Sequence, residues 1–216
     1  MALARAERAD LAELLATLTP EQWNAPSRCT EWRVRDVVAH MFSYEELGPV
    51  ALVRRFAAAR FDGDGVNALG VADYAERSTD ELLVRVHSHL QPSGLTARFG
   101  GRIALTDGLI HHQDIRRALG LPREVPADRL RAVVRVAPVA PPIRARRRIR
   151  GLTLTATDLQ WSIGRGPIVT GPGEALLVAV AGRPAALWEL SGPGLPILVE
   201  RIGPEGSTEG SAGRRS

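Results

Sequence analysis

Apolar residues recur at helical spacing through the N-terminal half of the chain. This period predicts amphipathic helices that each bury one face. Ser78 and Glu81 stand at capping-box spacing before one run, and Gly120 followed by Pro122 ends another. The pattern therefore predicts four helices packed as a bundle, whose apolar positions fall within residues 11–18, 34–42, 82–90 and 103–115.

The second of these helices is expected to begin near Arg33 and to run to about Arg60, with an interruption at Gly48-Pro49. The sequence DGDG (62–65) follows it. Because Gly and Asp are typical of turns, this segment is expected to be a loop.

The apolar period becomes strand-like near residue 150. After a short fifth helix from Pro126, the stretches APVAPP and RARRRIR are interpreted as an interdomain crossing. LTLTATD (152–158) alternates apolar and polar residues, and QWSIG and GPIVTG resemble short strands with turns. EALLVAVAG (174–182) is typical of a buried helix, and a last strand is expected at 197–201.

These changes predict an α+β protein. A helical bundle is expected over residues 1–124, a helix and linker over 125–150, and a small α/β domain over 151–202. Residues 203–216 are rich in Gly, Ser and charge, so they are expected to form a disordered tail.

Charge narrows the choice of partners. The chain of 216 residues has a net charge of +4, and all its basic residues other than histidine are arginines. They concentrate in Arg144 to Arg150 and at Arg214 and Arg215, without the interleaved aromatic residues of a single-strand binding surface. Composition thus argues against nucleic acid as a partner, and the absence of lysine fits a GC-rich genome.

The N-terminal sequence does not predict secretion, and no segment of the sequence predicts membrane insertion. The N-terminal MALARAERADLAELL carries acidic residues and resembles an amphipathic helix more than a signal peptide. No apolar stretch reaches the length of a membrane span. A single cysteine, Cys29, excludes an internal disulfide and a cysteine-rich zinc site. We expect a cytoplasmic protein.

Three side chains with metal-binding chemistry lie on two of the predicted helices. Asp107 and His111 are four residues apart, so they share one helix face. His40 ends the run RVRDVVAH on another helix. Two histidines and one carboxylate suit zinc, nickel or iron(II) and leave coordination positions open for a substrate.

Longer segments around these residues resemble a known family. QWNAPSRCTEWRVRDVVAHM (22–41) and DGLIHHQDIRRALG (107–120) are similar to the two signature regions of the mycothiol-dependent maleylpyruvate isomerase family, whose N-terminal domain is a DinB-like metal-binding four-helix bundle. The segment 156–194 resembles the small α/β C-terminal domain that often follows this bundle.

The resemblance implies a divalent metal, with zinc favoured, held by His40, Asp107 and His111. It also implies mycothiol as a low-molecular-weight thiol cosubstrate. The family usually has glutamate at position 107, so the chain departs by one methylene there. It also commonly has Ser or Thr at position 33 as a helix cap, a role that Thr30 could take here.

The function that the resemblance implies is activation of the thiol for isomerisation of a small electrophile or transfer to it. Two alternatives stay open. Loss of metal binding through the aspartate would leave a noncatalytic protein that binds a small ligand or regulatory partner. An open metal position could instead activate water, which would make the protein a hydrolase.

Residues around the three candidate ligands have two interpretations each. Asp36 and Asp114 could orient the ligand histidines, or form helix ion pairs with Arg33 and Arg117. Arg183 could bind an acidic substrate or the thiol, or pair with Glu174 or Glu189. Cys29 and Trp32 are interpreted as packing residues. His112 is interpreted as an exposed residue or as one that supports a ligand from outside the site.

Overall fold

A computed structural model describes residues 1–29 and 32–203. The expected cap Thr30 and nearly all of the expected tail 203–216 lie outside the described residues. The chain divides into two compact units, residues 1–136 and 137–216. Their boundary falls later than the expected end of the bundle at residue 124, because the helix predicted after Pro126 belongs to the first unit. Helices with one small sheet give the protein an α+β fold.

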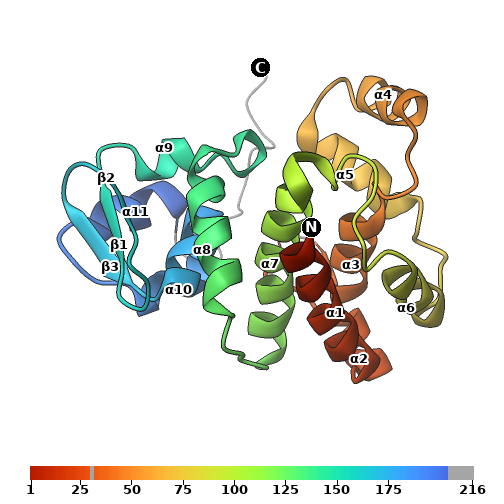
Figure 1. Cartoon of the computed structure of the whole chain (residues 1–216), viewed down its shortest axis with the longest axis horizontal. Coiled ribbons are helices and arrows are strands. Elements are labelled where there is room, and N and C mark those ends of the chain that lie inside the picture. The colour runs from red at the N-terminus through yellow and green to blue at the C-terminus, as the bar shows by residue number, and fades with distance from the viewer. Residues whose placement is uncertain (30–31, 204–216) are drawn as a thin grey trace, which may run out of the picture. The chain divides into compact units, whose positions relative to one another are not determined.

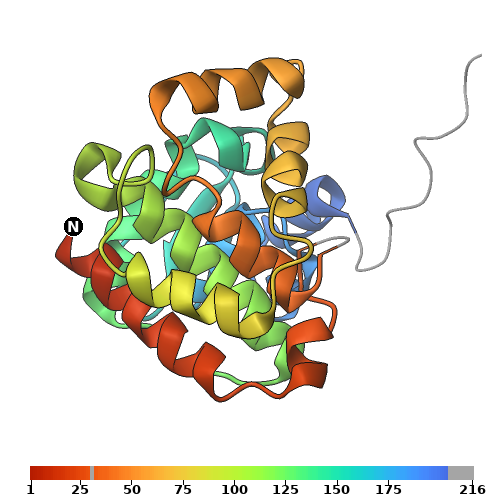
Figure 2. The ribbon, with the colours of Figure 1, turned by 90° about the vertical axis from the view of Figure 1, so that its right-hand side faces the viewer.

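Four helices form the core of the first unit (Figures 1 and 2). Helix α1 (Ala2–Ala16) packs against α7 (Arg98–Leu119) and α6 (Thr79–Ser88), and α3 (Val34–Phe42) also packs against both. Their apolar faces meet in one cluster that includes Leu11, Leu15, Val37, Phe42 and Ile115. The helices of this unit are α1 (Ala2–Ala16), α2 (Pro20–Asn24), α3 (Val34–Phe42), α4 (Pro49–Ala58), α5 (Gly63–Ala72), α6 (Thr79–Ser88), α7 (Arg98–Leu119) and α8 (Ala127–Val136).

The expected loop at residues 62–65 is wrong. Asp62 caps α5, because its carboxylate accepts the backbone N–H of Gly65 at 2.8 Å. Asp and Gly favour a helix start as well as a turn, and the downstream residues decide between them. Helix α5 packs on α3, and Gly70 permits the approach, since a Cβ there would lie 2.5 Å from Ser43 Oγ.

Helix α7 carries two of the candidate ligands and has an irregular beginning. Phe99, Gly100 and Gly101 all have positive φ, at 54°, 69° and 80°. The regular part then runs to Leu119 and ends at Gly120, which adopts the left-handed conformation with φ of 65°. The predicted glycine stop is confirmed.

The second unit is built on a sheet of three strands in the order β2-β1-β3. Strand β1 (Thr153–Ala156) pairs antiparallel with β2 (Ser162–Gly164) and parallel with β3 (Ile168–Gly171). Helix α10 (Gly173–Val180), predicted as a buried helix, packs against β1 and β3. The other elements of this unit are η1 (Ala137–Val139), η2 (Pro141–Ile143), α9 (Ala145–Ile149), η3 (Pro184–Glu189) and α11 (Leu195–Ile202).

The strand expected at residues 197–201 is wrong, because this segment lies within helix α11. Its β-branched residues favour a strand locally. Pro196 instead occupies the first helical turn, where its fixed φ favours a helix, and Leu198 is fully buried. The described part of the chain contains no helix with the length and apolar character that a membrane span requires.

Candidate metal site

Helices α3 and α7 bring the three predicted ligands together. Asp107 Oδ1 lies 3.5 Å from His40 Nε2 and 3.5 Å from His111 Nε2. The centroids of the two imidazole rings are 4.9 Å apart, with the rings nearly perpendicular at 79°. The ligand atoms of all three residues lie within 4.8 Å of one another. The geometry can hold one divalent cation.

Asp107 is the most exposed of the three candidate ligands. The side chain of Asp107 is 36% exposed, whereas His40 and His111 are buried. Burial raises the pKa of Asp107, but the charges of His111 and His40 and a hydrogen bond from His40 outweigh it and lower the pKa to about 2. The site therefore presents an ionised carboxylate beside two imidazoles at neutral pH.

A buried carboxylate supports one of the two histidines. Asp114 Oδ2 lies 3.0 Å from His111 Nδ1, and its side chain is fully buried. A carboxylate on the far nitrogen fixes the tautomer of an imidazole and the direction of its ring. The hydrogen bond leaves Nε2 of His111 to face Asp107.

Asp36, the other residue expected to orient a ligand, binds Arg33. Its Oδ2 accepts the backbone N–H of Arg33 at 3.0 Å and Nε of the same residue at 2.9 Å. These bonds close the first turn of α3. They replace the cap that a Ser or Thr at position 33 would provide. The structure thus contains the alternative ion pair with Arg33, and a role of Asp36 in orienting His40 stays a prediction.

Two aromatic rings flank the histidines. The centroid of the Trp32 ring lies 4.9 Å from that of His40 and 6.5 Å from that of His111. Tyr44 contacts His40 edge-on at 6.1 Å and donates its hydroxyl to Asn67 Oδ1 at 2.7 Å. Burial and the nearby Asp107 charge raise the pKa of Tyr44 to about 12, so the phenol stays neutral.

Sequence reasoning missed the position of Cys29. Its thiol, a nitrogen of His111 and a carboxylate oxygen of Asp114 lie within 4.8 Å of one another. Cys29 precedes His111 by more than eighty positions, so spacing gave no signal. The connection arises because the backbone N–H of Arg28 donates to the carbonyl of Asp114 at 3.2 Å.

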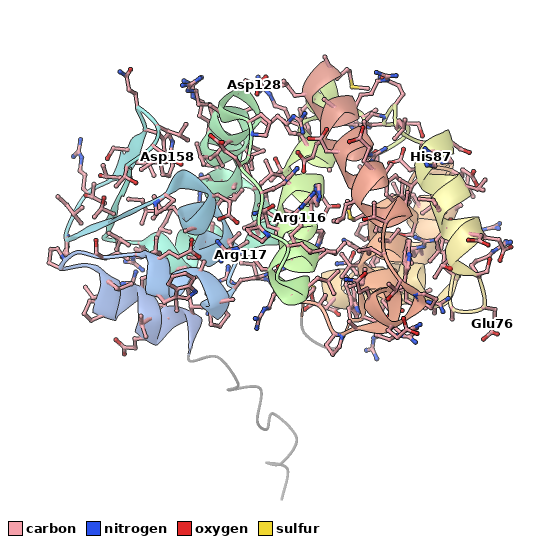
Figure 3. All side chains as sticks on the ribbon, turned by 90° about the horizontal axis from the view of Figure 1, so that it is seen from below. Glu76, His87, Arg116, Arg117, Asp128 and Asp158 are labelled. Atoms are coloured by element: carbon pink, nitrogen blue, oxygen red, sulfur yellow. The ribbon has the colours of Figure 1, made fainter. Side chains whose placement is uncertain are left out.

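His112 is also placed differently from the expected exposed or ligand-supporting position. The residue is fully buried, with Nδ1 2.8 Å from Glu7 Oε1 and Nε2 accepting a hydrogen bond from Arg116 Nε at 2.9 Å. Glu7 also binds Arg123 and, at 3.0 Å, Arg129. This ionic network joins α1, α7 and α8. Its residues on α7 lie on the opposite side of that helix from Asp107 and His111, and Arg116 is labelled in Figure 3.

Arg183 and His87 lie outside the groups of possible metal ligands among the described residues. Arg183 belongs to the second unit, where its Nη1 donates to the carbonyl of Ala181 at 2.9 Å, and its predicted contact with substrate or thiol stays a prediction. His87 is exposed on the outer side of α6 (Figure 3).

Comparisons with known proteins identify the fold and the family of the chain. Two crystal structures, of the mycothiol-dependent maleylpyruvate isomerase and of its histidine-to-alanine mutant, each align with a TM-score of 0.53 and 14% sequence identity. Both alignments cover 89% of this chain and 90% of the other chain. At this identity the likeness shows the fold alone, and no functionally curated protein matches the chain. The model of the mycothiol maleylpyruvate isomerase N-terminal domain matches residues 4–160, which include all three candidate ligands, and the chain therefore belongs to this family.

Proposed function

We propose that the protein is a divalent-metal-dependent enzyme that activates mycothiol, a low-molecular-weight thiol, for isomerisation of a small electrophile or transfer to it. The convergence of His40, Asp107 and His111 is the observation that carries the proposal. Membership of the family supports the choice of thiol. Zinc is the proposed ion because two imidazoles and a carboxylate suit its borderline-soft character.

The spacing of the three ligands fits such an ion. Nitrogen and oxygen ligands lie about 2.0–2.2 Å from zinc, which places tetrahedral ligand atoms about 3.4 Å apart. Asp107 Oδ1 is 3.5 Å from the Nε2 atom of each histidine. The aspartate, although shorter than the glutamate usual in the family, therefore reaches between both imidazoles.

A bound divalent ion supplies Lewis acidity that lowers the pKa of a coordinated thiol and makes thiolate available at neutral pH. The chain's own residues prepare this chemistry. Asp114 fixes the ring of His111, and Trp32 and Tyr44 shield the face of His40. The partly exposed Asp107 marks the side from which thiol and electrophile enter.

Metal analysis and turnover together test the proposal. Protein purified without a histidine tag is expected to bind near-stoichiometric zinc and to convert an electrophile such as maleylpyruvate only when mycothiol is present. His40→Ala is expected to abolish this turnover, because it removes one of three ligands. Wild-type protein that takes up no divalent ion, even after reconstitution, would contradict the proposal.

The departure at position 107 provides a matched pair of variants. Asp107→Glu restores the usual family carboxylate and is expected to keep metal binding and turnover, whereas Asp107→Asn removes the charge and is expected to lose turnover. Equal turnover in Asp107→Asn and wild type would exclude Asp107 as a ligand, whereas a wild-type protein without thiol-dependent turnover would favour the noncatalytic alternative. Activity that is independent of mycothiol would favour the hydrolase, in which water takes the open position.

A further inference from the structure

A second group of metal-binding side chains lies behind the first. The thiol of Cys29, a nitrogen of His111 and a carboxylate oxygen of Asp114 are within 4.8 Å of one another, and the group shares only His111 with the triad of His40, Asp107 and His111. The three residues come from the loop before α3 and from α7. Each offers a different ligand chemistry.

The backbone fixes the place of the cysteine. Ser27 Oγ accepts the N–H of Cys29 at 3.0 Å, and the carbonyl of Cys29 accepts the N–H of Trp32 at 3.1 Å. The neighbouring Arg28 N–H is bound to the carbonyl of Asp114. The thiol is therefore held beside α7 by hydrogen bonds on both sides of its own residue and by a direct bond from the loop to the helix.

The partners of the thiol are polar and buried. The side chain of Asp114 is fully buried and that of His111 is 10% exposed. A cysteine that only filled space would be expected among apolar side chains, because a thiol behaves as a small hydrophobe. Cys29 instead contacts the core on one side and lies close to a carboxylate and an imidazole on the other.

The geometry points to a second metal site formed by Cys29, His111 and Asp114, which takes soft divalent ions such as Cd²⁺ in preference to hard ones. Thiolate sulfur is the ligand that selects soft metals, and imidazole and carboxylate complete the set. The triad of His40, Asp107 and His111 has no sulfur ligand. The two sites should thus differ in metal preference.

Occupation of the two sites is mutually exclusive. His111 faces Asp107 through Nε2 and Asp114 through Nδ1. A neutral imidazole has a free lone pair on one ring nitrogen at a time. An ion held by Cys29 and Asp114 takes Nδ1 of His111, so the proton moves to Nε2 and the triad loses a ligand. If the triad performs the thiol chemistry proposed above, an ion bound at the second site inhibits that activity. This consequence rests on the proposed function.

Cadmium titration tests this site directly. Cys29 is the chain's single cysteine, so thiolate-to-cadmium charge-transfer absorption in the near ultraviolet reports on it alone. We expect this absorption in wild type and in Asp107→Asn, with saturation at one ion per chain. In Asp114→Asn and in His111→Ala the apparent Kd is expected to rise at least about tenfold, as loss of ligand support does in other metal sites.

Each other outcome overturns part of the proposal. Absence of the absorption in Asp107→Asn, or an unchanged Kd in both Asp114→Asn and His111→Ala, excludes the site. Two ions bound per wild-type chain exclude the shared use of His111. Cys29→Ala checks the background, and circular dichroism verifies that each variant is folded. Because the readout in Asp107→Asn needs no turnover, it is independent of whether the thiol chemistry proposed above is correct.

Discussion

Asp114 is expected to affect the zinc affinity of the triad through its contact with His111. Its carboxylate holds His111 Nδ1 at 3.0 Å from a fully buried position. We expect Asp114→Asn to weaken zinc binding at the triad by about 10–100-fold, because the amide no longer favours the tautomer that presents Nε2. Isothermal titration with zinc would measure the change.

Asp36→Asn is the matched control for this variant. Asp36 lies on α3, the helix of a candidate ligand, but its carboxylate binds Arg33. We expect unchanged zinc affinity and a small loss of stability from the weakened cap. A large loss of affinity in Asp36→Asn would show that this residue supports His40 after all.

Glu7 is expected to contribute to the acid sensitivity of the first unit. Burial raises its pKa, but hydrogen bonds from His112 and Arg123 and the charge of Arg123 outweigh this and lower it from 4.5 to about 2. A carboxyl with a lowered folded pKa stabilises the protein above its unfolded pKa, and this stability is lost as the pH falls from 4.5 towards 2. Glu7→Gln should therefore flatten the acid limb of stability against pH.

Urea unfolding would measure both effects of Glu7. At neutral pH we expect Glu7→Gln to lower the free energy of unfolding by about 1–3 kcal/mol, because it removes the buried one of the two carboxylates that pair with Arg123 and Arg129, and only the more exposed Asp10 is left. Glu13→Gln, an exposed position on the same helix, should change it by less than about 0.5 kcal/mol. Equal effects of the two substitutions would mean that the network contributes nothing specific.

At the scale of the elements, α5 depends on a close approach to α3. A Cβ at Gly70 would lie 2.5 Å from Ser43 Oγ and 3.1 Å from Arg55 Nη1. Gly70→Ala is therefore expected to destabilise the protein by about 1–3 kcal/mol through overpacking, although alanine is the better helix former. Thermal unfolding followed by circular dichroism would measure the loss.

Gly63→Ala is the control, because a Cβ there meets no atom within 4 Å. It should leave stability unchanged or raise it by up to about 1 kcal/mol, since alanine restricts the unfolded chain. If Gly70→Ala proved as harmless as Gly63→Ala, the contact between α5 and α3 would not be tight.

The sequence predicts elements well where the apolar period is long and a cap or stop is present. Helix α6 begins at the expected capping box of Ser78 and Glu81, and α7 ends at Gly120. It fails for α5 and α11, where local residue preferences disagree with the observed helix. There, burial of a few side chains such as Leu198 outweighs propensity, and the partners that provide it are distant in sequence.

The candidate site divides in the same way. The four-residue step from Asp107 to His111 is visible in the sequence, because one helix sets it. The pairing of His40 with these two residues was supported by the resemblance to a family. The place of Cys29 beside His111 could be found only in the structure. The two interpretations of Asp36 and of Asp114 could not be separated from spacing, since each residue has an acceptable ion-pair partner one helical turn away.

For the whole molecule, metal binding should be visible as stability. A ligand that binds only the folded state at 100 times its Kd adds about 2.7 kcal/mol to the free energy of unfolding. We expect zinc to give such a shift in urea unfolding followed by circular dichroism, and chelation to reverse it. His111→Ala lacks the residue shared by both sites and should show no shift. A shift of equal size in that variant would place the stabilising ion elsewhere.

Trp32 makes the candidate site observable without any substrate. Its ring centroid lies 4.9 Å from that of His40 and 6.5 Å from that of His111, so we expect a metal ion bound by these candidate ligands to change the electric field on the indole and its fluorescence emission. The other tryptophans are Trp23, Trp161 and Trp188. Their emission can be removed by subtracting the spectrum of Trp32→Phe from that of the wild type. The protein thus carries an intrinsic optical probe with which metals and thiols can be screened before its electrophile is identified.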